Sequence, residues 1–106
     1  MKKNRFKGFE RYALVTGAAS GMGRIYCQRL AQMGYNIIAV DINQAGLEET
    51  VRMVNEQVKS SAVVPEVSKA AFKALPMVQD LSLPTAADAV YGMTVENGCE
   101  VEVLVN

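Results

Sequence analysis

The stretch TGAASGMGR (residues 16–24) places three glycines in nine residues, directly after the apolar run YALV (residues 12–15). The apolar run predicts a β-strand, and the helical spacing of the apolar residues that follow predicts a helix. A turn from a strand into a helix leaves backbone N–H groups unpaired at the positive end of the helix dipole. The stretch therefore predicts a phosphate-binding turn.

Each glycine of this turn has a separate predicted role. Gly17 permits a tight exit from the strand, Gly21 lets the backbone approach a pyrophosphate, and Gly23 allows the helix to pack closely on the strand. Ser20 is interpreted either as a hydroxyl for the phosphate or as the cap of the helix. Because glycine triplets also occur in ordinary turns, the prediction depends on the position between a strand and a helix.

Outside this turn, strands alternate with helices. We predict strands at 12–16, 36–41, 73–79 and 101–106, and helices over about 22–33, 44–59 and 82–97. Pro76 indicates that the third strand lies at an edge of the sheet, where a missing N–H costs little. With right-handed crossovers this is a three-layer Rossmann-type α/β fold, truncated, with a parallel sheet of strand order 3-2-1-4 and helices on both faces.

Two helices carry apolar residues at helical spacing, which predicts the faces that they bury. These residues are Met22, Ile25, Tyr26, Leu30 and Met33 in the first helix and Leu47, Val51, Val54 and Val58 in the second. The segment from Asp41 to Asp80 is about a dozen residues longer than a helix, two loops and a strand require. We expect the surplus, at about 60–72, to form a surface loop or an added helical turn without a chemical role.

Composition indicates one globular domain over residues 1–106, with 50% hydrophobic residues. Eleven basic residues balance eleven acidic ones, so we expect neither nucleic acid nor a membrane as a partner. The basic opening KKNRFK (residues 2–7), within a basic tail over residues 1–10, is predicted to be a solvated or frayed terminus rather than a binding arm or a signal peptide. Cys27 and Cys99 are far apart and histidine is absent, which predicts reduced thiols and no metal site. A cytoplasmic location is expected because no apolar run has the form of a signal peptide or the length of a membrane span.

Asp41 lies 18 residues after Gly23, at the end of the second predicted strand. A carboxylate at this place accepts both hydroxyls of an adenosine ribose and repels a 2′-phosphate, so NAD is favoured over NADP. Two alternatives stay open. Asp41 could cap the next helix instead, and Arg24 could assist a 2′-phosphate, which would admit NADP.

The spacing Thr-Gly-x-x-x-Gly-x-Gly in residues 16–23 resembles the coenzyme turn of the short-chain dehydrogenase/reductase family. Asp41 matches the acid that the family has after its second strand. Met22 stands where the family more often has Ile or Leu, which is a conservative difference. By this resemblance Met22 belongs to the cofactor-binding turn together with the glycines and Ser20.

Two further segments agree with the family. Asp80 and Leu81 resemble the Asp-Leu or Asp-Val pair that contacts adenine, and VLVN (residues 103–106) resembles the start of the Asn-Asn-Ala-Gly strand motif, which adds Asn106 to the site. The resemblance covers nearly the whole chain. It implies an NAD(P)-dependent oxidoreductase that transfers a hydride between nicotinamide and an alcohol or carbonyl group, with a 3-oxoacyl thioester as a common substrate in this family.

Members of the family use a Ser, a Tyr and a Lys four residues after the Tyr, whose ammonium lowers the pKa of the phenol. No tyrosine here has a lysine at that spacing. Four residues after the tyrosines at 12, 26, 35 and 91 stand Thr16, Leu30, Ala39 and Val95. We therefore expect the amino-terminal, cofactor-binding half of a longer reductase, without catalytic residues, inactive alone, and truncated by design or by a break in the gene.

Two other classes of protein are alternatives to a reductase. A Rossmann-like methyltransferase usually has its glycines closer together than Gly17 and Gly21. A stand-alone nucleotide-sensing module would be ruled out by a reading frame that continues into a Tyr-x-x-x-Lys segment. Because the fourth strand would be an open edge, we expect a homo-oligomer, with two-fold pairing through that strand.

Overall fold

The computed structural model describes residue 6 and residues 8–106. Its four strands form one parallel sheet in the order β3-β2-β1-β4. The strands are β1 (Tyr12–Thr16), β2 (Asn36–Asp41), β3 (Ala74–Val78) and β4 (Val101–Val105), and the helices are α1 (Gly21–Gln32), α2 (Gln44–Ser60), the 3-10 helix η1 (Glu66–Ala71) and α3 (Ala86–Glu96). The predicted fold class and strand order are confirmed, with Pro76 on the edge strand β3.

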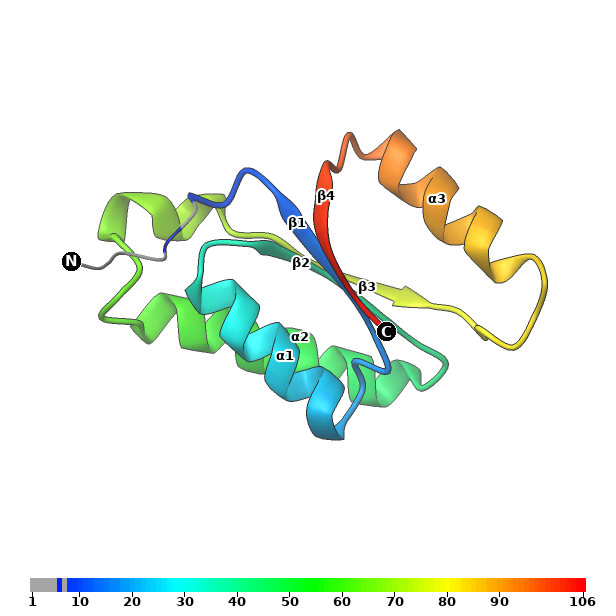
Figure 1. Cartoon of the computed structure of the whole chain (residues 1–106). Coiled ribbons are helices and arrows are strands. Elements are labelled where there is room, and N and C mark those ends of the chain that lie inside the picture. Colours follow the sequence, from blue (N-terminus) through cyan, green and yellow to red (C-terminus); the bar gives the residue numbers. More distant parts are fainter. Residues whose placement is uncertain (1–5, 7) are drawn as a thin grey trace.

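Helices cover both faces of the sheet (Figure 1). Alternate residues of β1 and β2 face α1 and α2 on one side, and the residues between them face α3 on the other. The first set comprises Ala13, Val15, Ile37 and Ala39, and the second comprises Leu14, Ile38 and Val40. The continuous apolar run of β2 thus reflects a parallel strand that is buried on both faces.

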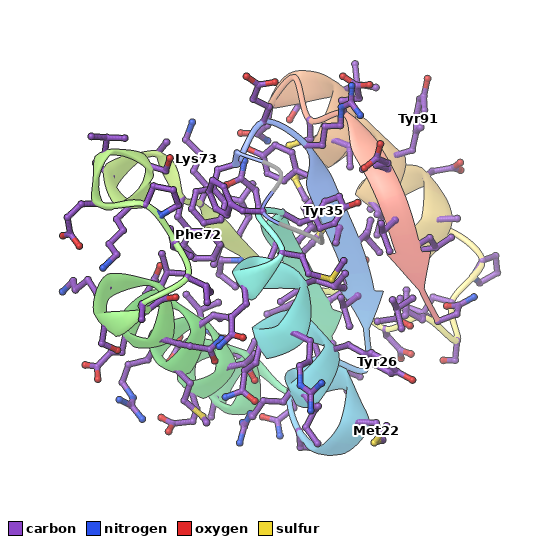
Figure 2. The ribbon with its side chains drawn as sticks, turned by 60° about the vertical axis from the view of Figure 1, so that its left-hand side comes forward. Met22, Tyr26, Tyr35, Phe72, Lys73 and Tyr91 are labelled. Atoms are coloured by element: carbon purple, nitrogen blue, oxygen red, sulfur yellow. The ribbon has the colours of Figure 1, made fainter. Side chains whose placement is uncertain are left out.

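The predicted buried face of α1 is wrong at the start of the helix. The large residues there are exposed, by 62%, 44% and 41%: Met22, Ile25 and Tyr26. Met22 and Tyr26 extend from α1 into solvent (Figure 2). The buried residues are instead the small Cys27 and Ala31. A Cβ on Gly23 would lie 2.0 Å from the carbonyl oxygen of Gly17, so α1 approaches the end of β1 too closely for large side chains on its inner face.

The predicted face of α2 is correct at three of its four positions. Leu47, Val54 and Val58 are buried, but the fourth buried residue is Thr50, and Val51 is only half-buried. A fully buried hydroxyl requires a hydrogen-bond partner. Thr50 finds its partners at the glycine turn, as described below.

Phe9 belongs to the core, so the solvated tail expected over residues 1–10 is wrong at this position. Its side chain is 5% exposed and its ring centroid lies 4.9 Å from that of Phe72. Its N–H donates to the carbonyl of Gly34 over 2.7 Å. The expectation for residues 1–5 and 7 lies outside the described residues.

The surplus residues between α2 and β3 contain the added helical turn, η1. This segment precedes β3, so it lies at the end of the sheet where the parallel strands begin (Figure 1). The residues predicted to bind a cofactor follow the strands and lie at the opposite end. The lack of a chemical role in the surplus segment stays a prediction.

Candidate functional site

In a parallel sheet all strands end at the same, carboxyl-terminal edge. Every predicted site residue lies at or after the end of a strand. The glycine turn follows β1, Asp41 is the last residue of β2, Asp80 and Leu81 follow β3, and Asn106 follows β4. The structure therefore brings these segments to the same edge (Figure 1). This edge is where ligands bind in open parallel α/β sheets.

The glycine turn leaves β1 through a tight backbone, as predicted for Gly17. Gly17 and Gly21 have φ values of +64° and +58°, in the left-handed region that favours glycine. Ser20 occupies the N-cap position of α1, but its side chain makes no capping hydrogen bond, so the capping interpretation is wrong. The amides of Gly21, Met22 and Gly23 have no intrahelical carbonyl to bind, because they lie in the first turn. They remain as donors at the positive end of α1.

Asp41 is held by two backbone amides. Its Oδ2 accepts from the N–H of Ala19 over 3.0 Å, and its Oδ1 accepts from the N–H of Asn43 over 3.1 Å. Asn43, and not Asp41, caps α2, with its side chain accepting from the N–H of Gly46 over 3.0 Å. The alternative interpretation of Asp41 as the helix cap is therefore wrong. A carboxylate accepts about four hydrogen bonds, so Asp41 retains acceptor capacity while its orientation is fixed.

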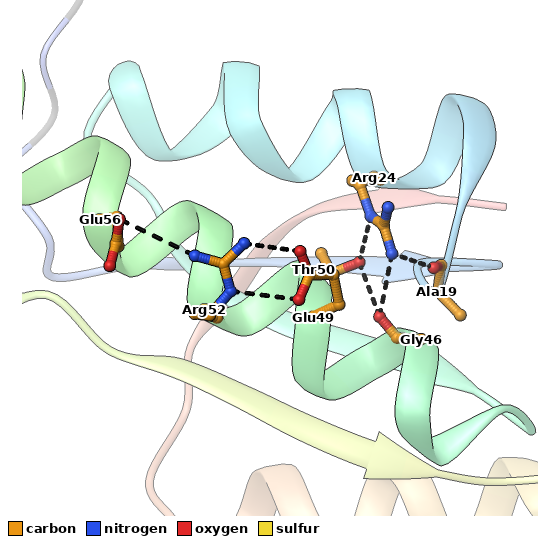
Figure 3. A network of polar contacts seen from close by, with 7 residues as sticks. All are labelled: Ala19, Arg24, Gly46, Glu49, Thr50, Arg52 and Glu56. Atoms are coloured by element: carbon orange, nitrogen blue, oxygen red, sulfur yellow. Dashed lines mark hydrogen bonds and ion pairs between the residues drawn. The ribbon is translucent and has the colours of Figure 1, made fainter.

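Arg24 is engaged by the protein itself. Its Nε donates to the hydroxyl of Thr50 over 2.8 Å, and its Nη2 donates to the carbonyls of Ala19 and Gly46 over 2.6 and 3.2 Å (Figure 3). Sequence reasoning missed this cluster. The available signal was Thr50, a hydroxyl-bearing residue on the apolar stripe of α2 between Leu47 and Val54.

The segment after β3 is ordered by its own hydrogen bonds. The Oδ1 of Asp80 accepts from the hydroxyl of Ser82 over 2.6 Å and from its N–H over 3.0 Å. Both hydrogen bonds from Ser82 favour the ionised carboxylate and hold the pKa of Asp80 below its usual value. The bond from the hydroxyl has the larger effect, and the bond from the N–H has the smaller one. Asp80 thus fixes the turn that leads toward α3.

Leu81 lies on the α3 side of the sheet, where it lines an apolar groove of about 540 Å³. The groove runs between α3 and the strands β1 and β4, and Leu14 and Leu104 form part of its wall. Tyr91 borders it and is 72% exposed on the outer surface of α3 (Figure 2). The structure thus places Leu81 at an apolar surface next to the carboxyl ends of the strands.

Asn106 is tied to the beginning of the glycine turn. The hydroxyl of Thr16 lies 3.1 Å from the Oδ1 of Asn106 and 3.3 Å from the carbonyl of Val105, and it donates to one of them. This contact joins the ends of β1 and β4. It keeps Asn106 directly beside the residue that precedes Gly17.

Other chemistries find little support in the part of the chain that the structure describes. No group of three or more His, Cys, Asp or Glu side chains there could hold a metal ion. The thiol of Cys27 is buried, and burial raises its pKa to about 12, so it is a poor nucleophile. Among the described helices, none combines the length and the apolar character needed to span a membrane.

Comparisons with known proteins agree with this geometry. The family model described as short chain dehydrogenase matches residues 11–106. The very-long-chain 3-oxooacyl-coA reductase let-767 of Caenorhabditis elegans is 33% identical over 97 residues, which are 90% of this chain and 27% of that protein. The chain thus spans about a quarter of the length of this curated relative.

Two solved structures have the same fold. NAD+-bound xylitol dehydrogenase is 26% identical and aligns with a TM-score of 0.71 over 92% of this chain and 33% of its own. L-sorbose reductase from Gluconobacter frateurii, solved with NADPH and L-sorbose, is 23% identical and aligns with a TM-score of 0.76 over 98% of this chain and 35% of its own. Proteins with this fold thus hold NAD+ in one case and NADPH in the other.

Proposed function

The chain belongs to the short-chain dehydrogenase family, and on that premise we propose that it binds the adenosine and pyrophosphate part of a nicotinamide dinucleotide, with NAD(H) preferred over NADP(H). The observation that carries the proposal is the position of Asp41. Its carboxylate is fixed by the amides of Ala19 and Asn43, beside the glycine turn and at the same edge of the sheet. The arrangement unites a donor set for phosphate with an acceptor for ribose.

The residues at the turn fit a pyrophosphate. A Cβ built on Gly17 or Gly21 would meet no atom within 4 Å, so the outer side of the turn is open. The absence of side chains at these positions leaves room for the phosphates to approach the backbone. The amides of Gly21, Met22 and Gly23 would donate to them, and the exposed hydroxyl of Ser20, which makes no capping bond, would add a donor.

The residues around the turn fit the adenosine. Asp41 would accept the two ribose hydroxyls, and its negative charge would repel a 2′-phosphate. Asp80 and Leu81 would border the adenine, with Leu81 supplying an apolar contact. Asn106, held by Thr16, would border the cofactor at the end of β4.

The reaction that we propose belongs to the whole protein. When bound, nicotinamide accepts or donates a hydride, and the partner is an alcohol or a carbonyl compound. We propose a 3-oxoacyl thioester as the substrate class, which the name of the Caenorhabditis elegans relative supports. For this chain we propose binding without turnover, because it has no lysine four residues after a tyrosine.

We also propose that copies of the chain associate through β4. Among the described residues β4 pairs only with β1, so its outer edge is open. Leu104 on this strand is 65% exposed and Val101 is 38% exposed, and both border the apolar groove. A cytoplasmic location is likewise a proposal, supported by the free thiols of Cys27 and Cys99.

A direct test separates the two halves of the cofactor. Calorimetric titration with ADP-ribose, 2′-phospho-ADP-ribose and nicotinamide mononucleotide should show binding of ADP-ribose, weaker binding of its 2′-phosphorylated form, and none of the mononucleotide. Binding of the mononucleotide alone would contradict the proposed site. Tighter binding of S-adenosylmethionine than of ADP-ribose would favour the methyltransferase class instead.

A further inference from the structure

A cluster of polar contacts lies behind the glycine turn, between α1 and α2, and we call it the Arg24 cluster (Figure 3). It comprises the side chains of Arg24 and Thr50 and the carbonyls of Ala18, Ala19 and Gly46. Thr50 is fully buried. Its hydroxyl accepts from Arg24 and lies 2.7 Å from the carbonyl of Ala18 and 3.1 Å from that of Gly46, to one of which it donates its proton.

The two alanines of the turn are held from both sides. On the side of β2, the N–H of Ala18 donates to the carbonyl of Val40 over 3.1 Å, and the N–H of Ala19 donates to Asp41 over 3.0 Å. On the opposite side, the carbonyl of Ala19 accepts from Arg24, and the carbonyl of Ala18 lies 2.7 Å from the hydroxyl of Thr50. Both alanines are buried, and the backbone of Ala19 contacts Asp41 through its N–H and Arg24 through its carbonyl.

The first turn of α2 sits directly against this part of the chain. A Cβ on Gly46 would lie 2.7 Å from the Cβ of Ala19 and 2.8 Å from its carbonyl oxygen. Glycine at this position therefore allows the backbone of α2 to reach the glycine turn. The guanidinium of Arg24 then joins the two backbones, because it donates to the carbonyls of both Gly46 and Ala19.

We infer that Arg24 is a positioning residue of the dinucleotide site: it ties Ala19 to α2 and thereby keeps the Ala19 N–H on the Asp41 carboxylate. This inference rests on the proposed function. Arg24 acts through Asp41 and is not a ligand of a 2′-phosphate. A planar guanidinium suits this role, since its donors diverge in a fixed fork toward the hydroxyl of Thr50 and two carbonyls.

Arg24→Lys tests this inference because lysine keeps the charge and loses the fork. Without the fork, Ala19 is released on one side and its N–H no longer fixes Asp41. We expect NADH binding to weaken about tenfold, the size of one lost hydrogen bond to a charged group. We expect NADPH binding to weaken less, so the preference for NADH declines. A ligand of the 2′-phosphate would show the opposite, with NADPH affected more.

A readout without cofactor gives a second measurement. Amide hydrogen exchange of Ala19 in the free chain should become about tenfold faster in Arg24→Lys, since its N–H loses a fixed acceptor. Amides in the centre of β1 should not change. Thr50→Val removes the acceptor of Arg24 Nε while keeping the shape of the side chain, and it should act in the same direction. The Thr50→Val variant also serves if Arg24→Lys unfolds.

Arg52 provides the matched control. It lies on α2 near the same cluster, but it is exposed and pairs with Glu49 and Glu56 on the helix surface (Figure 3). Arg52→Lys should change neither NADH binding nor the exchange of Ala19. If the unsubstituted chain binds NADH and Arg24→Lys binds it equally well, with Ala19 exchange unchanged, the inference alone is overturned. If the unsubstituted chain binds neither dinucleotide, the proposed function fails and the inference with it.

Discussion

The carboxylate of Asp41 accepts a hydrogen bond from the backbone N–H of Ala19 over 3.0 Å, although the two residues lie 22 positions apart. This contact joins the end of β2 to the glycine turn that follows β1. It places the proposed ribose acceptor beside the proposed phosphate donors before any ligand arrives. Preorganisation of this kind reduces the cost of ordering the site upon binding.

Replacement of Asp41 by asparagine should reduce the preference for NADH over NADPH. Asp41→Asn removes the negative charge and leaves one acceptor oxygen in place of two. We expect NADH affinity to decline about tenfold, while NADPH affinity declines less or rises because the repulsion of its 2′-phosphate is relieved. Titrations of both dinucleotides measure this change. Asp88→Asn, at an exposed position on α3, is the matched control, and an equal loss for both cofactors in Asp41→Asn would contradict the assigned role.

Gly23 should be the most sensitive glycine of the turn to alanine substitution. The new Cβ would lie 2.0 Å from the carbonyl oxygen of Gly17, so α1 must move away from β1. We expect a loss of about 2–3 kcal/mol in the free energy of unfolding, measured with urea. Gly92→Ala is the control, because its Cβ would meet no atom within 4 Å and alanine favours a helix by about 0.5–1 kcal/mol. Equal stability of the two variants would refute the close approach of α1.

Asp80 should titrate below its usual pKa of 3.8 in the folded chain, and Ser82 is the cause. A lowered folded pKa means that the contribution of this carboxylate to stability is complete above 3.8 and is lost as the pH falls through the folded value. Ser82→Ala removes the hydroxyl donor, so the pKa of Asp80 should rise toward its usual value. The NMR chemical shift of the Asp80 carboxyl carbon, followed against pH, measures this pKa in the unsubstituted chain and in Ser82→Ala. An unchanged titration of Asp80 in Ser82→Ala would disprove this cause.

Association through β4 should depend on Leu104. Sedimentation at increasing concentration should show a dimer that Leu104→Lys shifts toward monomer, since a charge cannot be buried in that interface at low cost. Val67→Lys is the control, because Val67 is 92% exposed on η1, at the other end of the sheet. A chain that stays monomeric at high concentration would rule out the proposed interface.

Much of the fold follows from local patterns in the sequence. The doubly buried run of β2 and the right-handed crossovers together restrict the sheet to the observed order. Pro76 removes one backbone donor, and β3 is indeed an edge strand. Gly17 has a left-handed backbone, which agrees with the tight exit from β1 that the sequence predicts.

The parts that sequence did not predict depend on contacts between distant segments. Apolar spacing could not identify the inner face of α1, because the close approach at Gly23 selects small residues there. The direction of Arg24 was equally undetermined, since a long side chain at the turn can reach a phosphate or α2. The approach of Gly46 to Ala19 decides in favour of α2, and it arises only when both helices are packed. The burial of Phe9 likewise depends on Phe72.

The most direct test of the central claim is a titration of this chain with NADH and with NADPH. Binding is measured by the fluorescence of the nicotinamide and by the temperature of thermal unfolding. The chain has no tryptophan, so its own emission interferes little with that of the nicotinamide. We predict that both dinucleotides raise the unfolding temperature and that NADH binds more tightly than NADPH, because Asp41 accepts the free ribose hydroxyls. No response to either dinucleotide, or tighter binding of NADPH, would contradict the account.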